Sequence, residues 1–201
     1  MTPTSASGRG RPPAASREML QDAAFELFLE NGYAGTTVEH IAQRAGVSRN
    51  TFFNYFEAKG DVFWVEFDEA IDAAQADLAS IQASDPLAAI RHALLHAAAS
   101  LGPSRVPFAL TQHDLIGSTH ELLSSGIGRV TRLAAILRDA QLACGEQKAT
   151  ATAYALTGAV VAAAQLWARA GSERGAFTPF VEAAIDPVLA GYAATAHGSV
   201  G

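Results

Sequence analysis

Five side chains within one short stretch could pair with nucleic acid. Their guanidinium, amide, hydroxyl and phenol groups are of the kinds that bond to base edges and phosphates in DNA. They are Arg49, Asn50, Thr51, Asn54 and Tyr55. Phe52 and Phe56 lie four apart among them and can be buried together on another face of a helix. A helix that enters a DNA groove needs one buried face and one polar face of this kind.

Two short helices joined by a tight turn, within residues 36–59, are predicted to position these groups. Thr37 is a natural N-cap of the first helix, whose apolar residues follow one-face helical spacing. Gly46 can adopt the positive φ that reverses the chain, and Ser48 can then cap the second helix. The stretch is therefore predicted to be a helix-turn-helix.

The segment from Leu20 to Val62 resembles the DNA-binding domain of the TetR family of bacterial transcriptional regulators. The resemblance rests on ELF at 26–28, NGY at 31–33, TTV at 36–38, IA at 41–42, AGVS at 45–48, and TFFNYF at 51–56 followed by Lys59. Two positions depart from the family pattern. Asn50 stands where the family usually has Gly, and Phe53, where it often has Tyr, lacks a hydroxyl for a phosphate contact.

A predicted DNA-binding set follows from this resemblance and from the polar groups. We expect Arg49, Asn50 and Thr51, at the start of the second helix, to reach base edges. The residues expected to position the phosphates are Thr37, Asn54, Tyr55 and Lys59. The expected partner is a double-stranded DNA operator.

Residues 1–15 are rich in Pro, Gly and Ser and are predicted to form a disordered basic arm. Within the arm, Arg9-Gly10-Arg11-Pro12 is similar to the core of an AT-hook, which lays its arginines along the minor groove of A·T-rich DNA. Arg9 and Arg11 are therefore candidate DNA contacts. The alternative is a solvated tail that leaves DNA untouched.

The composition favours an all-α chain. Helix formers dominate the 201 residues, 49% of which are hydrophobic, and no period-two alternation predicts strands. The net charge of −6 argues at first against a nucleic-acid partner. However, residues 1–60 hold six basic and six acidic side chains, so all of the excess acid lies in residues 61–201. A neutral N-terminal region still permits DNA binding if its basic groups share one face.

About nine helices are expected, divided between two domains. Residues 16–60 are the predicted three-helix DNA-binding domain, residues 61–195 a helical ligand-binding and dimerisation domain, and residues 196–201 a flexible tail. A long connector helix is expected from Gly60 to Ile81. Asp85 and Pro86 then suit the N-cap and first position of the next helix.

The last two predicted helices, 146–170 and 178–195, are apolar on more than one face. Such helices must bury a second side against something other than their own domain, and a second copy of the chain is the economical partner. The TetR resemblance also implies a homodimer at this place. The predicted interface consists of small residues that allow close helix approach, namely Ala155, Gly158, Ala159, Ala162 and Ala163.

A cytoplasmic location is expected. Cys144 is the single cysteine, and the polar N-terminus lacks the apolar segment of a signal peptide. Residues 149–168 carry no charge over about twenty positions, a length that could span a bilayer. Their Ala, Thr and Gly content, with Gln165, argues against insertion, so no membrane association is expected.

The later region holds the candidates for a small-molecule effector site. Aromatic and imidazole groups on apolar helices suit a mostly apolar ligand with a few polar handles, although an ordinary core is the more common place for each aromatic. The candidates are Phe63, Phe67, His92, His96, Phe108, His113 and Trp167. The four-residue spacing of His92 and His96 could also hold a metal, but Ala93 stands where a zinc hydrolase has Glu. No metal and no cofactor are therefore expected.

These patterns together predict a ligand-responsive repressor, not an enzyme. The chain has no GxSxG elbow, and Gly8-Arg9-Gly10 lies in the arm and not at a strand-to-helix turn that could hold phosphates. Two alternatives stay open: a dimeric helical ligand-binding module without DNA binding, and an enzyme with an unrecognised site. The sequence patterns do not identify the effector or the operator, and they do not distinguish repression from activation.

Overall fold

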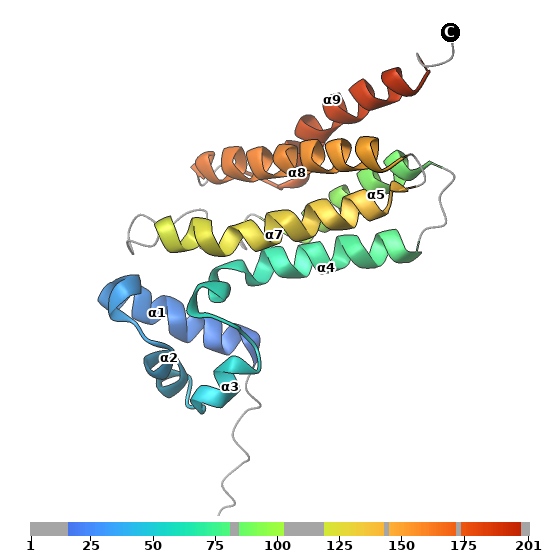
Figure 1. Cartoon of the computed structure of the whole chain (residues 1–201). Coiled ribbons are helices and arrows are strands. Elements are labelled where there is room, and N and C mark those ends of the chain that lie inside the picture. The colour runs from blue at the N-terminus through green and yellow to red at the C-terminus, as the bar shows by residue number, and fades with distance from the viewer. Residues whose placement is uncertain (1–15, 81–84, 103–118, 143–144, 172–173, 198–201) are drawn as a thin grey trace, which may run out of the picture.

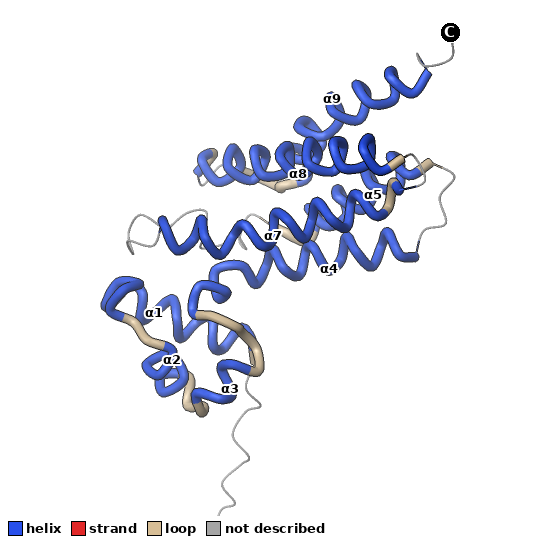
Figure 2. Tube along the Cα trace, viewed as in Figure 1, coloured by secondary structure: helices blue, strands red, loops and turns tan. Residues whose placement is uncertain are grey.

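A computed structural model describes residues 16–80, 85–102, 119–142, 145–171 and 174–197. Within these ranges the chain is helical with no strand, which confirms the all-α prediction (Figure 2). Eight α-helices and one 3₁₀ helix are described, close to the nine helices predicted. They are α1 (Arg17–Gly35), α2 (Val38–Arg44), α3 (Arg49–Phe53), η1 (Lys59–Trp64), α4 (Val65–Ser80), α5 (Pro86–Ala99), α7 (Thr119–Asp139), α8 (Glu146–Arg169) and α9 (Thr178–His197).

Helices α1, α2 and α3 form a small N-terminal unit, here called the head (Figure 1). Its core is aromatic: Phe63 of η1 is fully buried and packs on Phe25, Phe28 and Tyr33, with ring centroids 5.3–6.2 Å apart. Buried Ile41 and Phe52 bring α2 and α3 into the same cluster. Since η1 supplies the central ring, the start of the connector is built into the head.

Helices α4, α5, α7, α8 and α9 form the larger unit, here called the body. In Figure 1, α7 lies between α4 and α8, while α9 lies beyond α8 and leads to the C-terminus. One continuous core joins these helices, with Ile90, Leu137 and Leu156 all fully buried. On the surface, the Arg91 guanidinium of α5 is 2.8 Å from the Asp186 carboxylate of α9. Hydrogen bonding to Arg91 holds the pKa of Asp186 below its ordinary value.

The local signals predicted from sequence mostly define the helix ends. Asp85 caps α5 by accepting from the amides of Leu87 and Ala88, and Pro86 begins the helix. Helix α1 runs to Gly35 but breaks at Gly32, whose φ is 71°. The predicted connector helix differs at its start, because residues 59–64 form a 3₁₀ helix before α4 begins at Val65.

Residues 147–169 of α8 are long and apolar enough, by length and composition alone, to cross a membrane. In the structure, however, Leu156, Ala163 and Trp167 of this helix are fully buried in the body core. The same helix packs against both α7 and α9. This is the packing of a core helix in a helical bundle.

Candidate nucleic-acid interface

The turn between α2 and α3 is built by two side-chain caps and one glycine. Thr37 Oγ1 accepts from the His40 amide at 3.2 Å, and Ser48 Oγ accepts from the Thr51 amide at 3.0 Å. Gly46 has a φ of 70°, in the left-handed region that favours glycine. All three predicted signals are confirmed, and together they fix where α3 begins.

Helix α3 has one buried face and one exposed face. Phe52 and Phe56 are buried in the head, and their ring centroids lie 5.3 Å apart. The side chains of Arg49, Asn50 and Asn54 are exposed. Thr51 and Tyr55 are half-buried, and the Thr51 hydroxyl lies 2.9 Å from Ser48 Oγ. The polar face predicted from sequence is therefore present on the surface of the head.

Two neighbours hold the side chain of Arg49. Its guanidinium lies over the Phe53 ring, with Cζ 5.1 Å from the ring centroid. The Glu39 carboxylate of α2 lies 4.0 Å from Arg49 Nε. Both partners of this ion pair are mostly exposed, so it contributes little to stability. The pairing nevertheless keeps the guanidinium beside the exposed face of α3.

Lys59 occupies a different environment from the one its predicted phosphate role suggests. Its ammonium donates to the Tyr33 carbonyl at 2.6 Å and to the Thr36 carbonyl at 2.7 Å. It also lies 3.8 Å from the centroid of the Tyr33 ring. Lys59 thus ties η1 to the chain segment that joins α1 and α2, a role that no sequence motif indicated.

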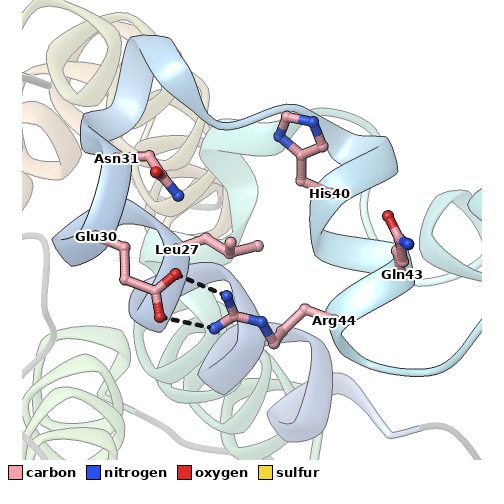
Figure 3. A pocket seen from close by; sticks show the side chains of 6 residues that line it. All are labelled: Leu27, Glu30, Asn31, His40, Gln43 and Arg44. Atoms are coloured by element: carbon pink, nitrogen blue, oxygen red, sulfur yellow. Dashed lines mark hydrogen bonds and ion pairs between the residues drawn. The ribbon is translucent and has the colours of Figure 1, made fainter.

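Arg44 joins α2 to α1 at the rim of an open hollow (Figure 3). The hollow has a volume of about 540 Å³ and is lined by Leu27, Glu30, Asn31, His40, Gln43 and Arg44. Arg44 pairs with Glu30 at 2.7 Å and with Glu26 at 3.0 Å. Hydrogen bonding to Arg44 lowers the pKa of Glu30, and the hydrogen bonds to Glu30 and Glu26 raise the pKa of Arg44. The charge of Arg44 is therefore balanced by Glu26 and Glu30 within the head.

A side-chain network, here called the junction, joins η1 and α4 to α7. Arg129 of α7 donates to Asp68 at 2.8 and 2.9 Å and to Asp61 at 3.2 Å, and all three side chains are about one-fifth exposed or less. The Trp64 indole donates to Ser125 Oγ at 2.8 Å, and the Arg129 guanidinium lies over the Trp64 ring. These contacts fasten η1 and the first turn of α4 to the body.

The sequence did not predict the junction. Its residues lie about 60 positions apart along the chain and form no local motif. One indirect signal was present, since Gly126 interrupts an otherwise helical pattern. A Cβ at Gly126 would lie 2.9 Å from Trp64 Cζ2, so the glycine admits the indole ring.

The predicted effector-site residues do not converge in the part of the chain that is described. Phe63 belongs to the head core, and Phe67 packs against the body core. His92 and His96 are exposed on α5, where His96 Nδ1 lies 2.6 Å from Asp77 Oδ2. Trp167 is fully buried and donates to the Gly175 carbonyl at 3.0 Å. Two further candidates, Phe108 and His113, lie outside the described residues.

The small residues predicted for the dimer interface divide between two faces of α8. Gly158 and Ala162 are exposed, and Ala155 and Ala159 are half-buried. Ala163 is fully buried within its own chain, so it lines the inner face of α8. The outer face also carries larger exposed apolar side chains, which lie outside the predicted interface set: Tyr154, Val161 and Leu166. Arg9 and Arg11, proposed for the minor groove, lie outside the described residues.

Comparison with known proteins shows which family the head is similar to in sequence. Residues 20–63 match the sequence profile of bacterial regulatory proteins of the tetR family. The putative mycofactocin biosynthesis transcriptional regulator MftR of Mycobacterium tuberculosis is 33% identical over 87 residues, which are 43% of this chain and 44% of that protein. The HTH-type transcriptional regulator TcmR of Streptomyces glaucescens is 43% identical over 61 residues, 30% of this chain and 27% of TcmR. The matched segments thus span less than half of these relatives.

Solved structures extend the likeness to most of the chain. NalD, the secondary repressor of the MexAB-OprM multidrug efflux pump in Pseudomonas aeruginosa, superposes with a TM-score of 0.53 at 20% identity, covering 87% of this chain and 94% of NalD. Thermus thermophilus FadR, a TetR-family repressor in complex with lauroyl-CoA, has a TM-score of 0.55 at 22% identity, covering 87% and 93%. At these identities the likeness establishes the fold alone. Residues 20–63 of this chain thus match the tetR family of bacterial regulatory proteins, and most of its length shares the fold of NalD and FadR.

Proposed function

We propose that the chain is a transcriptional repressor that binds a palindromic operator as a homodimer and is released by a small, mostly apolar effector. The observation that carries the proposal is the division of α3 into a buried aromatic face and an exposed face with Arg49, Asn50 and Asn54. A short helix fixed in this way can present donors and acceptors to a groove without losing its place on the head.

The outer face of α8 supports the homodimer. Tyr154, Val161 and Leu166 are exposed there beside Gly158 and Ala162, and contiguous apolar surface of this kind marks interaction sites. A twofold axis next to α8 would pair two heads. Two-fold symmetry suits a palindrome whose half-sites are about one helical turn apart.

The effector would act through the connector. A ligand shifts a conformational equilibrium only when it prefers one state, so it must favour one spacing of the two heads over another. The junction supports such control because it fastens η1 and α4 to α7 of the body. The proposed pocket residues are Phe63, Phe67, His92, His96, Phe108, His113 and Trp167. The lauroyl-CoA complex of the FadR neighbour supports an acyl-type effector as one class to test.

DNA binding by the purified chain tests this function. The DNA flanking the encoding gene would be searched for an inverted repeat, and protection of that repeat would be measured against random DNA. Arg49→Ala is expected to cost about 1–3 kcal/mol of binding free energy on the preferred site and to relax specificity at one base position. Arg138→Ala, which removes a half-buried arginine from α7, is the charge-matched control and should bind as the parent chain does.

Other outcomes identify the alternatives. Equal losses for Arg49→Ala on the operator and on random DNA would contradict base recognition by Arg49. No protected site together with a dimer in solution would favour a ligand-binding module that does not bind DNA. Turnover on a panel of metabolites would favour an enzyme.

A further inference from the structure

One apolar side chain lies on the polar face of α3. Phe53 is 42% exposed, whereas Phe52 and Phe56 are 0% and 4% exposed. A single exposed apolar residue is common on protein surfaces and does not by itself indicate a site. The Phe53 ring, however, is also held in place by two neighbouring side chains.

The Phe53 ring is fixed from two sides. Phe52 meets it edge-on, with centroids 5.5 Å apart and an interplanar angle of 85°. Arg49, one helical turn earlier, lies over it with Cζ 5.1 Å from the centroid. Ring and guanidinium therefore form one ordered unit on the exposed surface of α3, and ordering before contact lowers the entropy cost of binding.

The chemistry of the phenyl group limits what it can contact on DNA. Phenylalanine has no hydrogen-bond donor, so it cannot bond to a phosphate oxygen as a tyrosine hydroxyl can. In the major groove, thymine alone among the bases presents a C5-methyl group, and apolar side chains contact that methyl. Arg49 has the opposite preference, because its fork of donors matches O6 and N7 of guanine.

The spacing of the two side chains sets the spacing of the two bases. Residues four apart on a helix lie about 5–6 Å from each other, and successive bases are about 3.4 Å apart along the duplex. A stacked Arg49–Phe53 unit can therefore reach neighbouring base pairs in one half-site.

We propose that Phe53 is a specificity-determining residue that recognises the C5-methyl group of a thymine, while Arg49, stacked on its ring, recognises a guanine in a neighbouring base pair. This inference rests on the proposed DNA-binding function. At position 53 the TetR family often has a tyrosine, whose hydroxyl can contact a phosphate. Phe53, which lacks that hydroxyl, instead contributes to recognition of the DNA sequence.

Replacing thymine by deoxyuridine tests the inference, because the exchange removes only the methyl group. The preferred site would first be selected from randomised palindromic DNA with the full chain. Each thymine would then be replaced in turn, and affinity would be measured by fluorescence anisotropy. One replacement per half-site is expected to weaken binding about fourfold, which corresponds to the burial of one methyl group. Phe53→Ala should bind the thymine and deoxyuridine sites equally.

Two variants provide controls. Phe53→Leu keeps an apolar side chain and should retain sensitivity to the methyl group. Leu29→Ala removes an apolar side chain from α1 that is even more exposed, at 61%, and should retain the full fourfold difference. Circular dichroism of each variant would separate loss of DNA recognition from loss of folding. The thymine replacements measured with the unaltered chain do not depend on the folding of any variant.

The possible failures are distinguishable. If no DNA sequence is selected, the proposed function is overturned and this inference falls with it. If a site is selected but every thymine can be replaced without loss, the inference alone is overturned. Full methyl sensitivity in Phe53→Ala would likewise overturn the role of Phe53.

Discussion

At the scale of single residues, Lys59 is held by the protein itself. The sequence predicted a phosphate contact, whereas its ammonium donates to the carbonyls of Tyr33 and Thr36. Hydrogen bonds to charged groups contribute about 1.5–3 kcal/mol each. Lys59→Met removes the donors while keeping the aliphatic stem, and it is expected to lower the free energy of unfolding by about 2–3 kcal/mol. Urea denaturation measures this change.

Lys148→Met is the control for that prediction, because Lys148 is exposed on α8 away from the head. It should leave the free energy of unfolding unchanged. The contradicting result is a Lys59→Met chain that is as stable as the parent chain yet binds all DNA sequences more weakly. That result would show that Lys59 contacts DNA phosphates and that its hydrogen bonds to the carbonyls contribute little to the free energy of unfolding.

At the scale of elements, two glycines of α7 have opposite predicted effects. A Cβ at the buried Gly126 would lie 2.9 and 3.0 Å from Trp64 ring atoms, so Gly126→Ala must displace the indole from the junction. Overpacking costs about 1–3 kcal/mol, against a gain of about 1 kcal/mol in helix propensity. The expected net change is a loss of up to about 2 kcal/mol in the free energy of unfolding.

Gly128→Ala, two residues later, is the matched control. A Cβ at Gly128 meets nothing within 4 Å, so the substitution gains helix propensity without a clash. It should raise the free energy of unfolding by about 0.5–1 kcal/mol. Equal effects of the two substitutions in thermal melts would show that the Trp64 contact does not constrain α7.

The contrast between caps and junction explains how far the sequence could predict this molecule. Thr37, Gly46 and Ser48 act within four residues of themselves, so their types and spacing were enough to place α2 and α3. Arg129 and Asp68 meet only because two helices pack, and nothing in either local sequence indicates the other. The packing of Phe63 could not be read from its local sequence for the same reason, since its burial depends on the aromatic rings of α1.

At the scale of the whole molecule, the outer face of α8 governs the proposed assembly. Val161 lies on this face and is 36% exposed. Val161→Asp would place an unpaired charge at the interface, and it is expected to weaken dimerisation more than about tenfold. Analytical ultracentrifugation measures the change, and operator binding at low protein concentration should fall with it.

Leu29→Asp is the control for the dimer prediction, since it places the same charge at an exposed apolar position of the head. It should leave the oligomeric state unchanged. A Val161→Asp chain that stays dimeric would move the interface to another surface, and the proposed position of the twofold axis would then be wrong.

The environment of Lys59 has a consequence for the chemistry of amine labelling. The chain has two lysines, Lys59 and Lys148, and only Lys148 presents an exposed side chain. In the folded head the Lys59 amine is occupied by carbonyls and covered by the Tyr33 ring, so acylating reagents should modify it only after the head opens. The ratio of label on the two lysines would therefore measure how often the head opens. Lys148 would give the labelling rate of an exposed lysine for comparison.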